Sequence, residues 1–217
     1  MTHIDCVQRF LEQQELRAPI YTVDMAEALS TTCGLGRKQA SATASVAVKR
    51  IMDEGRMPEL RRWERGVYYR TVETPFGETG INLEKVISRK YLSPGKGYET
   101  GLRLINRMGL STQMPRIRML ATNTAKRVRH DERLDVMLCP PKAPVNTGNK
   151  FYLQMLDAID LLDKAPIDIR NPYKLIAMHI KKRNLQYNIL LSYAYKYYNH
   201  KTIINIARIA SCETDSK

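Results

Sequence analysis

The first thirty residues carry apolar side chains at helical spacing, with one interruption. Apolar residues between Ile4 and Leu11 recur every three or four positions, which predicts a first helix that ends near Gln14. Residues 18–21 include a proline and break this pattern. Thr22 is then the predicted N-cap of a second helix, because its hydroxyl can accept a backbone hydrogen bond there. Two short helices are therefore expected before residue 34.

A third helix is predicted from about Arg37 to Glu54, with Gly55 at its C-terminal end. Its apolar positions form one stripe: Ala40, Ala44, Ala47, Val48 and Ile51. Its other face carries cations and small hydroxyl residues: Arg37, Lys38, Ser41, Ser45 and Lys49. Small side chains between cations let a helix backbone lie close to a DNA major groove. This polar face is the predicted base-reading surface.

A basic hairpin is predicted after the third helix. Two β-prone runs, residues 58–63 and 67–70, flank a turn that contains Gly66. Its cations are predicted phosphate contacts: Arg61, Arg62 and Arg65. Three helices followed by a hairpin predict a winged helix-turn-helix domain over residues 1–72. Such domains also bind proteins, and that alternative stays open.

The pattern changes after a predicted linker at residues 74–77. A helix is expected to begin at Asn82 and to end before Ser93, and another is expected from Tyr98 to Met108. The second of these carries Arg103 and Arg107 one turn apart, as further nucleic-acid contacts. Alternating apolar residues then predict short strands between residues 117 and 136.

The last quarter of the chain is predicted to be helical. One amphipathic helix covers residues 151–162 with three aspartates exposed beside it: Asp157, Asp160 and Asp163. Two or three helices are expected in residues 172–210, where tyrosines alternate with cations. These tyrosines either stack on bases or pack half-buried in the core. The expected fold class is α+β: the N-terminal winged helix-turn-helix, then a mixed α/β domain over residues 78–217 that is helical from about residue 150.

The charge distribution adds a partner to this outline. The net charge is +13 and the pI is near 9.7. Residues 1–70 hold eleven Lys/Arg against nine Asp/Glu, whereas residues 85–129 hold eleven against one, Glu99. Residues 171–212 hold seven Lys/Arg and no acid. Two long segments almost without acids favour a polyanionic partner, either nucleic acid or an anionic membrane surface.

Cysteines, histidines and apolar runs exclude several other classes of protein. The four cysteines and four histidines lie far apart, so we expect reduced thiols, no disulfide framework and no metal site. The chain starts without a basic leader, and no apolar run approaches about eighteen residues. We expect a cytoplasmic protein that does not enter a membrane.

No recognised catalytic motif occurs in the sequence. The segment from His130 to Asp135 is its only dense cluster of histidine and acidic residues. Such a cluster occurs in metal-dependent nucleases, but a solvated turn between strands fits better because no lysine follows at short spacing. We therefore expect a protein that is not an enzyme and that has no cofactor.

Several short motifs carry a family resemblance over about residues 4–140. They are Gly66-Val67-Tyr68-Tyr69-Arg70, Thr74-Pro75-Phe76-Gly77, Gly97-Tyr98 and Gly109-Leu110-Ser111-Thr112-Gln113-Met114-Pro115. In this order they resemble the AbiEi-type antitoxins of bacterial type IV toxin–antitoxin and abortive-infection systems. The resemblance implies a repressor that binds inverted repeats in its own promoter. It also implies an antitoxin that opposes a neighbouring nucleotidyltransferase toxin, often without a stable complex.

Two functions from different classes follow from the sequence. The first is a DNA-binding transcriptional repressor that acts as an antitoxin and regulates its own operon. The alternative is a non-enzymatic adaptor whose winged helix binds protein and whose basic second half binds RNA or the toxin.

Overall fold

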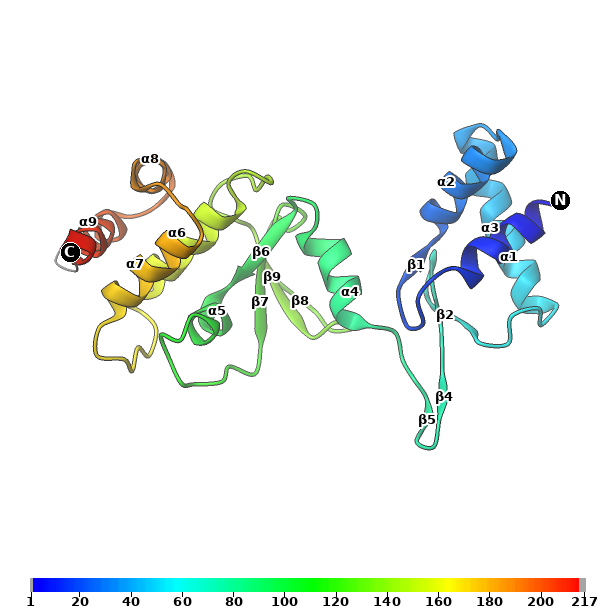
Figure 1. Cartoon of the computed structure of the whole chain (residues 1–217), viewed down its shortest axis with the longest axis horizontal. Coiled ribbons are helices and arrows are strands. Elements are labelled where there is room, and N and C mark those ends of the chain that lie inside the picture. The colour runs from blue at the N-terminus through cyan, green and yellow to red at the C-terminus, as the bar shows by residue number, and fades with distance from the viewer. Residues whose placement is uncertain (1, 215–217) are drawn as a thin grey trace. The chain divides into compact units, whose positions relative to one another are not determined.

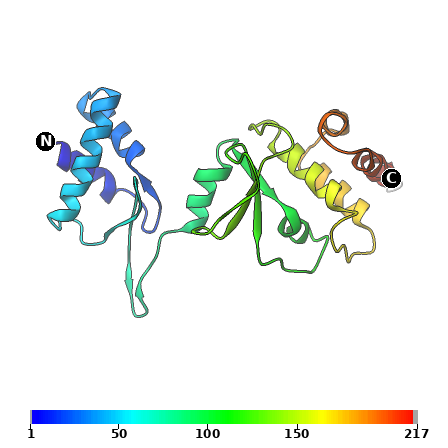
Figure 2. The same ribbon diagram turned by 180° about the vertical axis from the view of Figure 1, so that it is seen from behind.

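A computed structural model describes residues 2–214 of the chain, which divide into two units. The N-terminal unit is Met1–Val86 and the C-terminal unit is Ile87–Lys217. The described residues form a mixed α+β structure with nine α-helices, one π-helical segment and three sheets (Figures 1 and 2). This agrees with the expected α+β class. No helix in this range is both long and apolar enough to cross a membrane.

Three helices build the core of the N-terminal unit: α1 (His3–Glu12), α2 (Thr22–Cys33) and α3 (Arg37–Asp53). Leu11, Leu29 and Ile51, one from each helix, are fully buried in this core. Helix α1 ends two residues before the predicted Gln14. All three predicted helices are present within a few residues of their expected ends.

The apolar stripe of α3 is buried as predicted. Ala40, Ala44 and Val48 have no exposed surface, and Ala47 and Ile51 lie beside them in the core. The end of the helix is closed by hydrogen bonds from the backbone of Gly55 to Met52 and from Arg56 to Ile51. Because the stripe fixes the rotation of α3, its polar face is turned toward solvent.

The prediction that Thr22 is the N-cap of α2 is wrong. The N-cap is Tyr21, and Thr22 is the first helical residue. Tyr21 belongs to a two-residue strand, β1 (Ile20–Tyr21). This strand is too short to produce a recognisable pattern in the sequence. The Thr22 hydroxyl instead donates to the Gly66 carbonyl at 3.3 Å, so it bonds the hairpin rather than its own helix.

The predicted basic hairpin is present as β2 (Leu60–Glu64) and β3 (Val67–Arg70). With β1 it forms an antiparallel sheet in the order β1-β3-β2. Ile20 lies opposite Tyr68, and a register shift falls between Arg62 and Glu64. The hairpin is thereby attached to the three helices through the strand that precedes α2.

The predicted linker at residues 74–77 is instead a second hairpin, β4 (Glu73–Thr74) and β5 (Gly77–Glu78). The chain after it returns to the N-terminal unit, where the Asn82 amide donates to the Arg17 carbonyl at 2.8 Å. The Arg17 guanidinium in turn donates to the Gly80 carbonyl at 3.0 Å. The N-terminal unit therefore extends to Val86, beyond the predicted boundary at residue 72.

The C-terminal unit contains a four-stranded sheet of β6 (Gly97–Thr100), β7 (Arg118–Thr122), β8 (Arg129–Asp131) and β9 (Val136–Cys139). Its order is β6-β7-β9-β8, with only the β7–β9 pair parallel. The prediction of a helix that begins at Tyr98 is wrong in its first turn. Residues 98–100 pair with β7, and the helix, α5, is Gly101–Arg107.

Gly97 begins strand β6 at a point of close backbone approach. A Cβ atom on this residue would overlap the carbonyl oxygens of Tyr91 and Ala121. These two oxygens belong to the preceding helical segment and to the paired strand β7. Only glycine fits between them in this backbone arrangement.

Helices surround this sheet. Helix α4 (Leu83–Ile87) continues into the π-helical segment η1 (Ser88–Leu92), and the helix ends before Ser93 as predicted. The C-terminal helices are α6 (Lys150–Leu161), α7 (Pro172–Lys182), α8 (Tyr187–Tyr197) and α9 (His200–Thr214). They lie on one side of the sheet, and η1 lies on the other (Figure 1). Their shared core confirms the predicted helical last quarter, with three helices in residues 172–210.

Candidate nucleic-acid interface

The polar face of α3 is exposed over its whole length. Every residue predicted to face DNA from this helix is exposed: Arg37, Lys38, Ser41, Ser45 and Lys49. The Ser45 hydroxyl donates to the Ser41 carbonyl at 3.0 Å, which directs it along the helix and leaves its oxygen able to accept. This face carries small side chains in its middle and positively charged side chains at both ends.

A groove of about 470 Å³ lies between the C-terminal half of α3 and the β2–β3 hairpin. Its walls bring together four residues that the sequence predicted as nucleic-acid contacts, and these are Ser45, Lys49, Arg62 and Arg65. Asp53 is the acid among the lining residues, so cations exceed acids in the groove. The structure thus brings a helix face and the hairpin that follows it in the sequence to the two sides of one groove.

The position of the hairpin depends on Gly66 and Thr22. Gly66 has φ +79°, a left-handed conformation that favours glycine, and its carbonyl accepts hydrogen bonds from both the amide and the hydroxyl of Thr22. Sequence reasoning placed a turn at Gly66 but missed its bond to α2. This bond holds Arg65 at one wall of the groove.

Arg61 does not share the groove with Arg62. Neighbouring residues on a strand point to opposite faces, and the Arg61 guanidinium forms an ion pair with Glu78 of β5. It also donates to the Pro58 carbonyl at 2.6 Å. The hydrogen bonds that Arg61 donates to Glu78 raise the pKa of Arg61 and lower that of Glu78. Much of the hydrogen-bonding capacity of Arg61 is therefore used within the N-terminal unit.

Arg103 and Arg107 belong to the C-terminal unit and share a buried carboxylate. Glu99 of β6 is 4% exposed, and its two oxygens face three guanidinium groups. Arg103 lies 3.4 Å from Glu99, Arg107 pairs with its second oxygen, and Arg118 lies 3.1 Å from the first. The cluster carries three positive charges against one negative charge. Glu99 stands out in the sequence as the lone acid of a basic segment, but nothing in the sequence indicates that Arg118 pairs with it.

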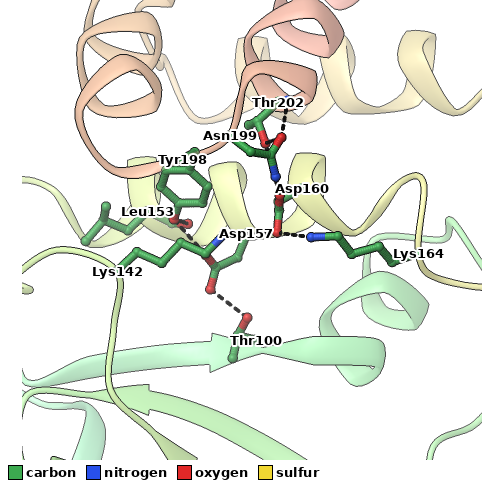
Figure 3. A network of polar contacts seen from close by, with 9 residues as sticks. All are labelled: Thr100, Lys142, Leu153, Asp157, Asp160, Lys164, Tyr198, Asn199 and Thr202. Carbon is green, nitrogen blue, oxygen red and sulfur yellow. Dashed lines mark hydrogen bonds and ion pairs between the residues drawn. The ribbon is translucent and has the colours of Figure 1, made fainter.

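The prediction that Asp157 and Asp160 are exposed is wrong. Asp157 is buried and accepts hydrogen bonds from the hydroxyls of Tyr198 (2.6 Å) and Thr100 (2.7 Å) (Figure 3). Burial raises the pKa of Asp157, although these hydrogen bonds oppose the shift. The helical stripe alone could not reveal this, because the polar partners come from β6 and from the end of α8.

Asp160 lies one turn further along α6, and its pKa is shifted in the opposite direction to that of Asp157. Its carboxylate lies 2.8 Å from Lys164 and 2.9 Å from Lys142, and it also accepts from Asn199 (Figure 3). Partial burial opposes ionisation, but the hydrogen bonds from Lys164 and Lys142 lower its pKa to about 2. The pKa values of two aspartates on one helix are therefore shifted in opposite directions because their neighbours differ.

The tyrosines of residues 187–198 differ in burial. Tyr193 stacks between Tyr152 and Tyr197, with ring centroids 6.4 and 6.2 Å away. Tyr187 and Tyr198 are also half-buried, whereas Tyr195 is exposed. Packing in the core accounts for most of this group.

The segment around His130 forms strand β8 and the turn that follows it. His130 lies 3.0 Å from Asp135, and Asp131 accepts from the Tyr91 hydroxyl at 2.5 Å. Within residues 2–214, no group of three or more histidine, cysteine or acidic side chains is arranged to hold a metal ion. The polar contacts of the His130–Asp135 segment are made within the turn and with η1.

Comparison with known proteins gives no relative for this arrangement. No protein-family model, no curated protein sequence and no solved structure matches the chain.

Proposed function

We propose that the chain is a DNA-binding transcriptional repressor whose N-terminal unit is a winged helix-turn-helix. In this proposal α3 lies in the major groove and the β2–β3 hairpin rests on the neighbouring backbone. The order of helices and strands, with the sheet order β1-β3-β2, supports it. The observation that carries the proposal is the groove that unites Ser45 and Lys49 with Arg62 and Arg65.

The chemistry of the groove suits a phosphate backbone beside base edges. Lys49 and Arg62 are exposed cations on opposite walls, so they can contact phosphates on either side of a helix seated in the major groove. Ser45 lies between cations and is short enough to let the helix backbone approach. Shape and charge therefore favour duplex DNA on this face.

A mobility-shift assay on the DNA upstream of the gene tests the proposal, with random duplex as competitor. Lys49→Gln and Arg62→Gln should each weaken binding by about tenfold, as the loss of one charge-assisted contact does. Arg50→Gln is the matched control, because Arg50 is exposed on the same helix but lines a different hollow with Thr43 and Val46. Equal losses in Lys49→Gln and Arg50→Gln would contradict a groove contact. Absence of any duplex binding would favour the adaptor function instead.

The antitoxin part of the proposal rests on the motif resemblance. The most specific motif, residues 109–115, forms a loop after α5 in which Thr112 donates its amide and hydroxyl to Asp168 at 2.8 and 2.6 Å. Met114 in this loop is 85% exposed. A polar substitution at this exposed position can therefore probe the motif without disturbing the core.

The resemblance implies a nucleotidyltransferase gene beside this one, and co-expression with its product tests the antitoxin role. The full chain should restore growth, and Met114→Asp should reduce the rescue while DNA binding is kept. Met178→Asp is the control, since Met178 is an exposed methionine on α7 outside the motif. Toxicity that persists with the full chain would refute the antitoxin role and leave the repressor role standing.

A further inference from the structure

A pocket of about 250 Å³ lies within the C-terminal unit, between β6, α5, α6 and α7. Four cationic side chains line it: Arg107, Arg118, Lys150 and Arg183. Glu99 is the acid among the lining residues. The one carboxylate cannot neutralise all four cations, so the walls of the pocket carry a net positive charge.

The arginines are held in place before any ligand arrives. Arg118 has a side chain 10% exposed and lies 3.1 Å from Glu99, which also binds Arg107. Arg183 donates to the side-chain oxygen of Gln154 at 3.1 Å. Gln154 in turn donates to the Glu99 carbonyl at 2.9 Å. Guanidinium groups fixed in this way lose little conformational entropy when they bind an anion.

Two of the cations that line the pocket, Arg107 and Arg183, repel each other. Desolvation lowers the pKa of Arg183, and the nearby charge of Arg107 lowers it further. An anion between the two guanidinium groups would relieve this repulsion, and a doubly charged anion would do so most strongly. Arginine also matches the oxygens of a phosphate with paired donors.

An aromatic ring stands at the same pocket. Phe151 is 47% exposed, with the Arg183 guanidinium 4.8 Å and the Lys150 ammonium 6.0 Å from its ring. An exposed ring beside cations suits a ligand that joins a phosphate to a flat heterocycle. The volume is below the roughly 300–1,000 Å³ of sites that enclose a drug-sized ligand, so the pocket suits the phosphate with its sugar.

We propose that this pocket binds the phosphate monoester of a nucleotide, with Arg107 and Arg183 on the phosphate and Phe151 against the base. The ligand is either a free nucleotide or the phosphorylated end of a nucleic-acid strand, which present the same chemistry. This site is separate from the groove of the N-terminal unit and does not depend on the proposed repressor function.

Calorimetric titration of the full chain at low salt tests the site with five probes. These are adenosine 5′-monophosphate, adenosine, inorganic phosphate, and a short single strand with either a 5′-phosphate or a 5′-hydroxyl. We expect the monophosphate or the 5′-phosphorylated strand to bind at least tenfold more tightly than its unphosphorylated counterpart. The tighter of these two identifies the source of the monoester. Equal binding of phosphorylated and unphosphorylated probes, or no binding of either, would overturn the proposal.

Variants separate this site from general charge attraction. Arg107→Gln and Arg183→Gln should each weaken monophosphate binding by about tenfold. Arg103→Gln is the matched control, because Arg103 lies on the same helix and pairs with the same Glu99 but does not line the pocket. A loss in Arg103→Gln as large as in Arg107→Gln would refute a contact inside the pocket.

Phe151→Ala tests the role of the ring without removing a charge. Binding of the monophosphate should weaken several-fold, and binding of inorganic phosphate should not change. An equal effect on both ligands would refute a contact between the ring and the base. These titrations contain no duplex, so their failure would leave the repressor function untouched, and a failed mobility shift would leave this site untouched.

Discussion

The two units of the molecule handle positive charge in opposite ways. The N-terminal unit is nearly neutral up to residue 70, yet it leaves Lys49, Arg62 and Arg65 around an exposed groove. The C-terminal unit holds most of the excess charge, yet three of its arginines converge on Glu99. The charged side chains that are buried within residues 2–214 all lie in this second unit, and they are Glu99, Arg118 and Asp157.

This contrast shows that the net charge of a unit differs from the number of its cationic groups that are available to contact a polyanion. A segment with a net charge of +10 attracts a polyanion over a distance comparable to the Debye length. Contact also requires N–H donors on guanidinium and ammonium groups that are still available, and each ion pair within the protein uses some of them. The nearly neutral unit can therefore provide the specific surface, while the strongly basic unit provides long-range attraction and a defined pocket.

The largest expected effect comes from removing the buried acid. Glu99→Gln leaves Arg118 buried without a counter-charge and should lower the free energy of unfolding by about 3 kcal/mol. Circular dichroism should report the loss. Trp63 is the single tryptophan of the chain and lies in β2, so its fluorescence should show a nearly unchanged transition for the N-terminal unit.

Glu132→Gln is the control for that experiment, because Glu132 is an exposed acid in the same unit. Its effect should stay within about 0.5 kcal/mol. Similar losses in the two variants would show that the arginine cluster does not depend on its buried carboxylate.

The next effect concerns the exposed unit. Ser45→Glu places a carboxylate in the groove beside the phosphates and should weaken specific DNA binding by about a hundredfold, or roughly 2.7 kcal/mol. Thr31→Glu is the matched control, since the Thr31 hydroxyl also donates to the carbonyl four residues earlier but lies on α2. Normal binding by Ser45→Glu in a mobility-shift assay would exclude α3 from the major groove.

A smaller effect tests whether an ion pair within the protein makes an arginine less available to contact DNA. Arg65→Gln should weaken specific and random duplex about equally and should reduce the slope of log affinity against log salt by roughly 0.9. Arg103→Gln should reduce the slope less, because Glu99 already binds that guanidinium. Equal reductions in a salt series would mean that paired arginines contact DNA as readily as unpaired ones, and the contrast between the units would fail.

The smallest expected effect is a pH dependence confined to the C-terminal unit. Burial raises the folded-state pKa of Asp157, so its contribution to stability is complete below the unfolded value near 3.8 and declines as the pH rises through the folded value. Asp157→Asn cannot ionise and should flatten this decline. Thermal unfolding followed by circular dichroism from pH 4 to 8 measures it, and identical pH profiles for the two proteins would refute the assignment.

The features predicted best from the sequence are those set by neighbouring residues. The stripe of α3 from Ala40 to Ile51 has a helical period and few alternatives, so its buried face could be read directly. The hairpin around Gly66 was likewise visible from its turn and its β-prone flanks. Four of the predicted contact residues, Ser45, Lys49, Arg62 and Arg65, meet at one groove for this reason.

The features that were missed depend on partners far along the chain. Tyr98 to Thr100 form a strand because they pair with Met119 to Ala121. The local pattern of apolar and polar residues does not indicate that pairing. Asp157 is buried because Thr100 and Tyr198 supply hydroxyl groups from 57 and 41 residues away. Pairing of Arg103, Arg107 and Arg118 with Glu99 likewise appears only when β6, α5 and β7 are brought together.

The tight fit at Gly97 has a consequence for recognising related chains. Any substitution there would push strand β6 away from β7 or displace the Tyr91 carbonyl, and Glu99 two residues later would move with the strand. Position 97 is thus a diagnostic position for this arrangement. A chain that shares the Gly97-Tyr98 pair, an acid two residues after the glycine and arginines at the positions of Arg103, Arg107 and Arg118 is expected to share the arginine cluster, even where little else in its sequence can be aligned.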